Sequence, residues 1–145
     1  MRTLGTNNPP LVIGDADGLI ALLHSDDANH ALAVQAAQKL VEHNADLLFP
    51  LTAIVEAATT LQRRLTIPPL VETVRQHVLQ GALLIEEVDT DLLTQASTLF
   101  NPFGSKQNTL FDAIVATTAH KYATTAIFSF DDWYTKQGLR VIPQL

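Results

Sequence analysis

The sequence predicts an α/β fold in which a mainly parallel sheet is covered by helices on both faces. Short apolar segments of the kind that form buried strands alternate along the chain with longer segments of helical periodicity. The strand segments are apolar in runs, as expected for parallel strands that are buried on both faces. Hydrophobic residues make up 47% and charged residues 17% of the chain, which is typical of a globular protein.

In the first half of the chain, two predicted strands are separated and followed by helices. Turn and capping residues from Ser25 to Asn29 separate the first two helices, and Pro68 and Pro69 open the fourth. The predicted elements are a strand at Leu11–Asp15, helices at Ala16–Leu23 and Ala28–Asn44, a strand at Asp46–Pro50, and helices from Leu51 to Leu65 and from Pro68 to about Gln80.

In the second half, the loop NPFGS at residues 101–105 divides two helices. The helix after this loop is apolar nearly all round, so we expect it to be buried. The predicted elements are a strand at Ala82–Val88, a helix from Asp89 or Thr90 to about Phe100, a helix at Thr109–Ala123, a strand at Thr125–Ser129, a short helix after Asp131 and Asp132, and a last strand at Leu139–Ile142.

The bulk properties limit the class of protein. A length of 145 residues fits one domain over residues 1–145. A net charge of −6 argues against a broad basic surface, but not against a nucleic-acid enzyme whose bound cation inverts the local field. The absence of cysteine excludes disulfides and thiolate metal sites. No signal peptide or membrane span is recognisable, so we expect a soluble, cytoplasmic protein.

Four acids stand where strands and buried helices would bring them to one end of the sheet. Asp15 and Asp131 follow predicted strands, and ligands of α/β folds bind beyond the carboxyl ends of strands. Glu56 lies one turn into a helix, and Asp112 is the only acid of an otherwise apolar helix. Each acid also has a plain structural explanation: Asp15 and Asp131 as helix caps, Glu56 as an exposed helical residue, and Asp112 with Thr109 as a capping box.

Taken together, these carboxylates favour a metal site. Several carboxylates within a few ångströms repel one another and hold protons unless a cation is present. Ligands that are all oxygen select a hard ion, Mg²⁺ or Mn²⁺. The five histidines show no metal-ligand spacing, and no P-loop, GxGxxG or GxSxG motif is present.

Four segments resemble those of PIN domains, and in particular the small VapC-type toxins of bacterial and archaeal toxin–antitoxin pairs. They are VIGDADGLIALL with DDANHALA behind it, FPLTAIVEAATTLQRR, NTLFDAIVATTA and IFSFDDWY, in the order and at the spacing typical of that family. The resemblance covers about residues 11–142. It implies a PIN-like three-layer α/β/α sandwich with a mainly parallel central sheet of four to five strands.

The resemblance also implies a function. It implies an Mg²⁺- or Mn²⁺-dependent ribonuclease that cleaves RNA phosphodiester bonds as the toxin of a toxin–antitoxin pair. The catalytic and metal-binding residues would be Asp15, Glu56, Asp112 and Asp131. The partners would be the RNA substrate, a small antitoxin protein and a second copy in a homodimer, with no membrane.

Other residues of these segments would have supporting roles. Ser129 matches a small hydroxyl position that often supports the site in the family, and Asp132 is a second acid beside the last one. Asp17 stands where the family more often has Ser, Thr or Asn, so we expect a supporting or capping role for it. Arg63 and Arg64 could contact RNA phosphates, although a solvated charged face explains them equally well.

Three other interpretations stay open. The segment DADG, with Asp15 and Asp17, looks like the opening motif of haloacid-dehalogenase-like phosphatases, in which the first Asp is the nucleophile and the second the general acid/base. However, only 13 residues follow Asp132, fewer than that family needs, and Glu56 and Asp112 would have no role. The remaining interpretations are a non-catalytic PIN-like interaction module and an α/β domain whose acids are all caps.

Overall fold

Strands and helices alternate along residues 9–145, the part of the chain that the computed structural model describes. The elements are β1 (Leu11–Gly14), α1 (Ala16–Leu23), α2 (His30–Glu42), β2 (Asp46–Pro50), α3 (Leu51–Arg63), α4 (Pro68–Leu79), β3 (Leu84–Glu86), α5 (Thr90–Leu99), α6 (Leu110–Lys121), β4 (Ile127–Phe128) and α7 (Trp133–Lys136). The predicted helices are confirmed, with ends that differ by at most two residues. None of the helices in this part of the chain combines the length and apolar character needed to cross a bilayer.

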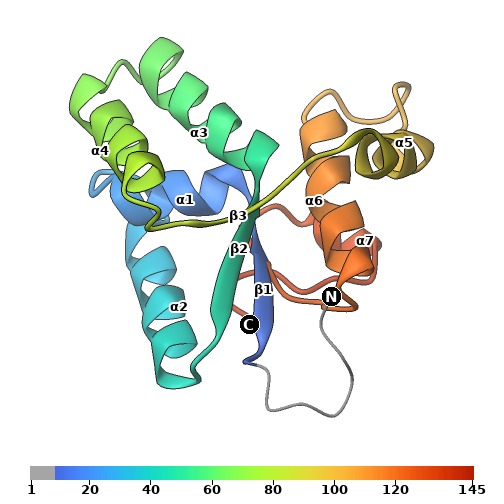
Figure 1. Ribbon diagram of the computed structural model, residues 1–145, viewed down its shortest axis with the longest axis horizontal. Coiled ribbons are helices and arrows are strands. Elements are labelled where there is room, and N and C mark those ends of the chain that lie inside the picture. Colours follow the sequence, from blue (N-terminus) through green and yellow to red (C-terminus); the bar gives the residue numbers. More distant parts are fainter. Residues whose placement is uncertain (1–8) are drawn as a thin grey trace.

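The strands of the described residues form one parallel sheet in the order β3–β2–β1–β4. In this sheet Ile13 of β1 pairs with Leu48 of β2 on one side and with Ile127 of β4 on the other. Figure 1 shows the sheet between α1 and α2 on one side and α6 and α7 on the other. The predicted three-layer α/β/α sandwich is therefore confirmed.

Neighbouring side chains of β1 pack into different helical layers. Val12 belongs to a buried cluster with Ala33 of α2, whereas Ile13 belongs to a cluster with Val115 of α6. Burial on both faces explains why the strands have apolar sequences. In α6, every residue from position 112 to position 119 is buried, so this helix carries an acid into the interior.

The predicted last strand at Leu139–Ile142 is wrong. Within it only Arg140 joins the sheet, through one parallel bridge to Ala126. The Ile127 N–H donates to Arg140 O at 2.8 Å, but the Ser129 N–H donates back to Ile127 O at 3.0 Å, within its own segment. The ladder ends because the chain bends at Ser129, and this bend brings the Ser129 hydroxyl to the first turn of α1.

Candidate active site

Five acidic side chains, which we call the acidic cluster, lie at the carboxyl end of the sheet between α1, α3 and α6. They are Asp15 after β1, Asp17 in α1, Glu56 in α3, Asp112 in α6 and Asp131 after β4. Burial raises the pKa of the first four, and neighbouring carboxylates of the cluster raise it further. The fold thus brings together the four acids that the sequence singled out, and Asp17 lies among them.

Asp15 is held at the end of β1 by two hydrogen bonds. Its Oδ1 accepts one from the Ala16 N–H at 2.7 Å, and its Oδ2 accepts one from the Tyr134 hydroxyl at 2.6 Å. Only 4% of Asp15 and none of Tyr134 is exposed. Burial is the main cause that raises the pKa of Asp15 well above its usual range, and the two hydrogen bonds act in the opposite direction. The carboxylate is therefore fixed in place but costly to ionise without a counter-charge.

Asp17 links the first turn of α1 to the end of β4. Its Oδ1 accepts a hydrogen bond from the Gly18 N–H at 2.8 Å, and its Oδ2 accepts bonds from Ser129 Oγ at 3.0 Å and the Phe130 N–H at 2.9 Å. Gly18 permits this close approach, because a Cβ at that position would stand 2.2 Å from Phe128 O. Burial raises the pKa of Asp17, and its hydrogen bonds lower it. Asp17 therefore positions the segment that carries the last acid of the cluster.

Asp112 belongs to a capping box at the start of α6. Its Oδ2 accepts a hydrogen bond from the Thr109 N–H at 2.9 Å, and the Thr109 hydroxyl accepts one from the Phe111 N–H at 3.3 Å. The capping-box explanation is correct, yet Asp112 is only 8% exposed and faces other acids. Burial, followed by the charge of Asp131, raises its pKa, while the Thr109 N–H lowers it. Capping and membership of the acidic cluster are therefore compatible.

Glu56 extends into the cluster from α3, and its carboxylate accepts no hydrogen bond from residues 9–145. Burial, together with the charges of Asp112 and Asp17, raises its pKa to about 7. One turn earlier on the same helix face, Thr52 Oγ1 is buried and has no hydrogen-bond partner among residues 9–145. A buried hydroxyl without a partner costs free energy. Both side chains are thus suited to a ligand at this end of the sheet.

Asp131 is oriented by three contacts. Its Oδ2 accepts a hydrogen bond from Asn108 Nδ2 at 2.9 Å, and its Oδ1 accepts one from the Trp133 N–H at 2.9 Å. Its own N–H donates to Ser129 Oγ at 3.1 Å, so Ser129 joins this acid to the first turn of α1. Asp132, by contrast, is exposed at the N-cap position of α7 and makes no capping hydrogen bond. The fold does not bring Asp132 into the acidic cluster.

The carboxylate oxygens of the acidic cluster are ligands that suit a hard divalent cation. Within residues 9–145, no three acidic, histidine or cysteine side chains form a ready-made metal site. Most carboxylate oxygens of the cluster instead accept hydrogen bonds from the protein. A cation would offset the burial and repulsion that raise the pKa values, and carboxylates are the ligands that Mg²⁺ and Mn²⁺ prefer. By this criterion Asp15, Glu56, Asp112 and Asp131 fit such an ion.

The two arginines at the end of α3 differ in their position relative to the acidic cluster. Arg64 lines a cavity of about 310 Å³ together with Asp17. Arg63, the last residue of α3, is exposed and does not line this cavity. Only Arg64 therefore shares a cavity with an acid of the cluster.

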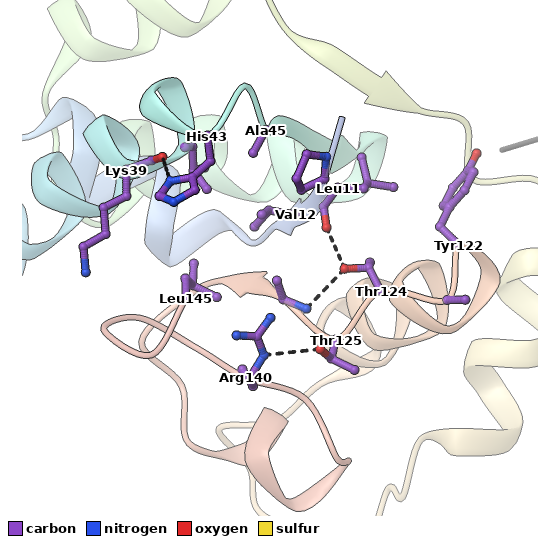
Figure 2. A pocket seen from close by; sticks show the side chains of 14 residues that line it. Leu11, Val12, Lys39, His43, Ala45, Tyr122, Thr124, Thr125, Arg140 and Leu145 are labelled. Carbon is purple, nitrogen blue, oxygen red and sulfur yellow. Dashed lines mark hydrogen bonds between the residues drawn. The ribbon is translucent and has the colours of Figure 1, made fainter. Parts of the chain in front are cut away.

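A larger cavity of about 500 Å³ lies at the opposite end of the sheet. Figure 2 shows three basic side chains in its lining, Lys39, His43 and Arg140, together with a hydrogen bond of 2.6 Å from Thr124 Oγ1 to Leu11 O. No acidic side chain lines it. This cavity is separate from the acidic cluster, where the candidate chemistry lies.

Sequence reasoning missed three side chains at the site, Tyr134, Asn108 and Thr52. The first two lie within the quoted segments IFSFDDWY and NTLFDAIVATTA, but their contacts join residues 119 and 23 positions apart, which no local pattern indicates. For Thr52 a signal was available. Its spacing of four from Glu56 places both side chains on one helix face.

Comparisons with known proteins identify the fold and the family of the chain. The structure is similar to that of VapC20 from Mycobacterium tuberculosis, a toxin that cleaves the sarcin–ricin loop. The TM-score is 0.74 at 19% sequence identity, and the match covers 89% of this chain and 96% of that one. No sequence among the curated proteins matches significantly. The PIN domain family matches residues 12–136, which include the whole acidic cluster, and the chain therefore belongs to the PIN-domain family.

Proposed function

We propose that this protein is a metal-dependent ribonuclease that hydrolyses RNA phosphodiester bonds, and that it is the toxin of a toxin–antitoxin pair. The observation that carries the proposal is the convergence of the acidic cluster at the carboxyl end of the sheet. Membership of the PIN-domain family supports nuclease chemistry, and the likeness in fold to a toxin that cleaves RNA supports RNA as the substrate.

In this proposal, Asp15, Glu56, Asp112 and Asp131 are the catalytic residues and hold Mg²⁺ or Mn²⁺. They must lose their protons when the ion binds, so binding depends on pH. A bound divalent ion lowers the pKa of a water ligand and stabilises the charge that develops at the phosphodiester. The hydrogen bonds to Asp15, Asp112 and Asp131 limit the rotation of these carboxylates and so keep the ligands close to one geometry.

The alternative interpretations receive less support. In a phosphatase, Asp15 and Asp17 would be the reacting groups. Glu56 and Asp112 would then have no role, although the charges of the acidic cluster act on their carboxylates too. A non-catalytic module would have no use for buried acids that raise the pKa of one another, because such acids destabilise a fold at neutral pH. The ribonuclease gives every member of the cluster a role.

The direct test is cleavage of a structured RNA by the purified protein with Mg²⁺ or Mn²⁺, and with EDTA as the metal-free control. We expect Asp15→Asn and Asp112→Asn to lower the rate by about 100-fold or more, since Asn offers the ion no charge. Asp91→Asn changes an exposed acid of α5 and should keep the wild-type rate. Cleavage that survives EDTA or either site substitution would contradict the proposal.

The toxin assignment adds a small antitoxin and a second copy of the chain as partners. Exposed apolar side chains on α3 and α4, among them Val55, Val78 and Leu79, support a protein contact on these helices. Expression of the protein in a bacterial host should arrest growth, whereas the Asp112→Asn variant should not. Normal growth with an active nuclease in the cell would contradict the toxin assignment and leave the ribonuclease intact.

A further inference from the structure

The cavity of about 310 Å³ beside the acidic cluster, which we call the side cavity, is suited to part of the substrate. It lies between α1, the turn that leads into α2, the end of α3 and the segment after β4. Asp17 belongs both to its wall and to the acidic cluster, so a group bound here would be adjacent to the reacting phosphodiester. Its volume is at the lower end of the range of roughly 300–1,000 Å³ found for small-molecule sites.

One part of the side cavity is apolar. Ile20, Leu65 and Phe130 contribute to the lining, and the last of these is only partly buried. The Phe130 N–H is fixed by Asp17, so the backbone that carries its ring is held in place. An aromatic ring and aliphatic side chains suit the flat face of an unpaired base, which is how proteins read single-stranded RNA.

The opposite part is polar and comes from a turn that is held by its own hydrogen bonds. Asp27 N–H donates to His24 O at 3.0 Å, His30 N–H donates to Asp27 O at 3.0 Å, and Asp27 Oδ1 accepts from the Asn29 N–H at 2.8 Å. Asn29 occupies the N-cap position of α2, where Asn usually caps, yet its side chain makes no capping hydrogen bond. Its amide and the second Asp27 oxygen are therefore open to a ligand in the side cavity.

The charges of the lining favour a neutral group over a phosphate. Two carboxylates, those of Asp17 and Asp27, line the side cavity together with one guanidinium, that of Arg64, and the imidazole of His24. A carboxylate accepts hydrogen bonds from N–H groups on a base edge, and a guanidinium donates to base acceptors. Guanine carries both sets, since N1 and N2 are donors on one edge and O6 and N7 are acceptors.

We propose that the side cavity binds one unpaired base of the RNA, next to the cleaved bond, and that it selects guanine through Asp27 and Arg64. This inference rests on the proposed ribonuclease function and adds a recognition site to it. The base would stack against Phe130, with the Asn29 amide as a further polar contact.

The first test uses uncharged nucleosides, which need neither metal nor catalysis. Binding of guanosine, adenosine, cytidine and uridine to the full chain in EDTA is followed by amide chemical shifts in NMR. We expect guanosine to bind most tightly and to move the signals of Asn29 and Phe130. Equal binding of all four nucleosides, or shifts confined to other parts of the chain, would overturn the inference.

Neighbouring residues provide matched controls. Asp27→Asn keeps an acceptor for the Asn29 N–H, so the turn should persist, and Arg64 is exposed at the end of α3. We expect Asp27→Asn and Arg64→Ala each to weaken guanosine binding by about 5- to 100-fold. Asp26→Asn and Arg63→Ala change residues that do not line the side cavity and should weaken it less than about twofold. If Asp26→Asn weakened guanosine binding as much as Asp27→Asn, or Arg63→Ala as much as Arg64→Ala, the side cavity would not be the guanosine site.

The second test separates this inference from the proposed function. Wild-type protein and the Arg64→Ala variant cleave an RNA pool with randomised positions, and the products are sequenced. We expect guanine to be enriched at one position beside the wild-type cut, and the variant to lose that enrichment. Cleavage without any base preference would overturn the inference and leave the ribonuclease intact. Guanosine binding without RNA cleavage would contradict the ribonuclease and, with it, the substrate role of the side cavity.

Discussion

The Tyr134 hydroxyl donates a hydrogen bond of 2.6 Å to Asp15 Oδ2, across 119 positions of the sequence. This contact joins α7 to the end of β1 inside the buried part of the acidic cluster. A hydroxyl donor stabilises the ionised form of an acid, so Tyr134 opposes part of the rise in pKa that burial causes at Asp15. Tyr134 is thus a positioning residue that keeps Asp15 available to a cation.

Removal of this hydroxyl should move the pH dependence of the enzyme. In Tyr134→Phe the pKa of Asp15 should rise further, so cleavage and Mn²⁺ binding should require a higher pH than in the wild type. The lost hydrogen bond should also lower the free energy of unfolding by about 1–2 kcal/mol. Tyr122→Phe is the matched control, since the other tyrosine donates to Glu86 away from the cluster. An unchanged pH profile in Tyr134→Phe would contradict the role given to Tyr134.

The stability of the metal-free protein should fall as the pH rises. Burial raises the pKa of Asp15, Asp17, Glu56 and Asp112, so the folded state binds protons more tightly than the unfolded state. The resulting stabilisation is complete below the pKa values of the unfolded state and is lost as the pH rises through the pKa values of the folded state. For Glu56 this loss covers the interval from pH 4.5 to about 7. Denaturant unfolding in EDTA at several pH values measures this loss.

Two comparisons make the pH test specific to the acidic cluster. Glu56→Gln should flatten the fall in stability between pH 4.5 and about 7, because a group that titrates in that interval is removed. Millimolar Mg²⁺ or Mn²⁺ should restore stability at pH 7, since an ion that binds the folded state stabilises it. Stability that rises with pH over this interval in EDTA would contradict the electrostatic description.

Loss of one acid should stabilise the metal-free fold while it abolishes activity. Asp112→Asn removes a charge that acts on Asp15 and Glu56, and its amide oxygen can still accept from the Thr109 N–H. We expect the free energy of unfolding at pH 7 in EDTA to rise by about 1 kcal/mol. The control Asp89→Asn changes the cap of α5 and should not stabilise the fold. If Asp112→Asn instead lowered the free energy of unfolding as much as the cap variant Asp89→Asn, Asp112 would have a purely structural role.

Gly18 should be intolerant of any side chain. The added Cβ of Gly18→Ala would stand 2.2 Å from Phe128 O, and the backbone would have to shift in the segment that binds Asp17. We expect a loss of about 2–3 kcal/mol in the free energy of unfolding. Gly104→Ala, whose Cβ would stand 3.3 Å from Asn101 O, should cost less than about 1 kcal/mol. A loss of stability in Gly18→Ala as small as that in Gly104→Ala would contradict the need for close packing at Gly18.

Local patterns in the sequence predicted most of the fold. The periodicity that distinguishes a strand from a helix is contained in a few consecutive residues, so Asp46–Pro50 and Ala16–Leu23 are confirmed with their predicted ends. The strand predicted at Leu139–Ile142 is wrong because one hydrogen bond, from the Ser129 N–H to Ile127 O, ends the ladder. Apolar composition alone does not report such a bend.

The candidate site was predictable as a set of acids but not as a network. The strand-end position of Asp15 and the helix-start position of Asp112 predict that both acids lie at one end of the sheet. The hydrogen bonds that orient the acids come from partners distant in sequence, and Tyr134 has no local signal for its role. The central position of Asp17 likewise depends on the close approach of two elements at Gly18.

Binding of one or more divalent ions by the acidic cluster can be seen by anomalous X-ray diffraction from crystals soaked in Mn²⁺. We expect an anomalous peak within coordination distance, roughly 2–2.5 Å, of carboxylate oxygens from at least two of Asp15, Glu56, Asp112 and Asp131. The same soak of Asp112→Asn crystals should give a much weaker peak. A Mn²⁺ peak elsewhere in the molecule, with none at these four residues at saturating Mn²⁺ and neutral pH, would contradict metal binding by the acidic cluster.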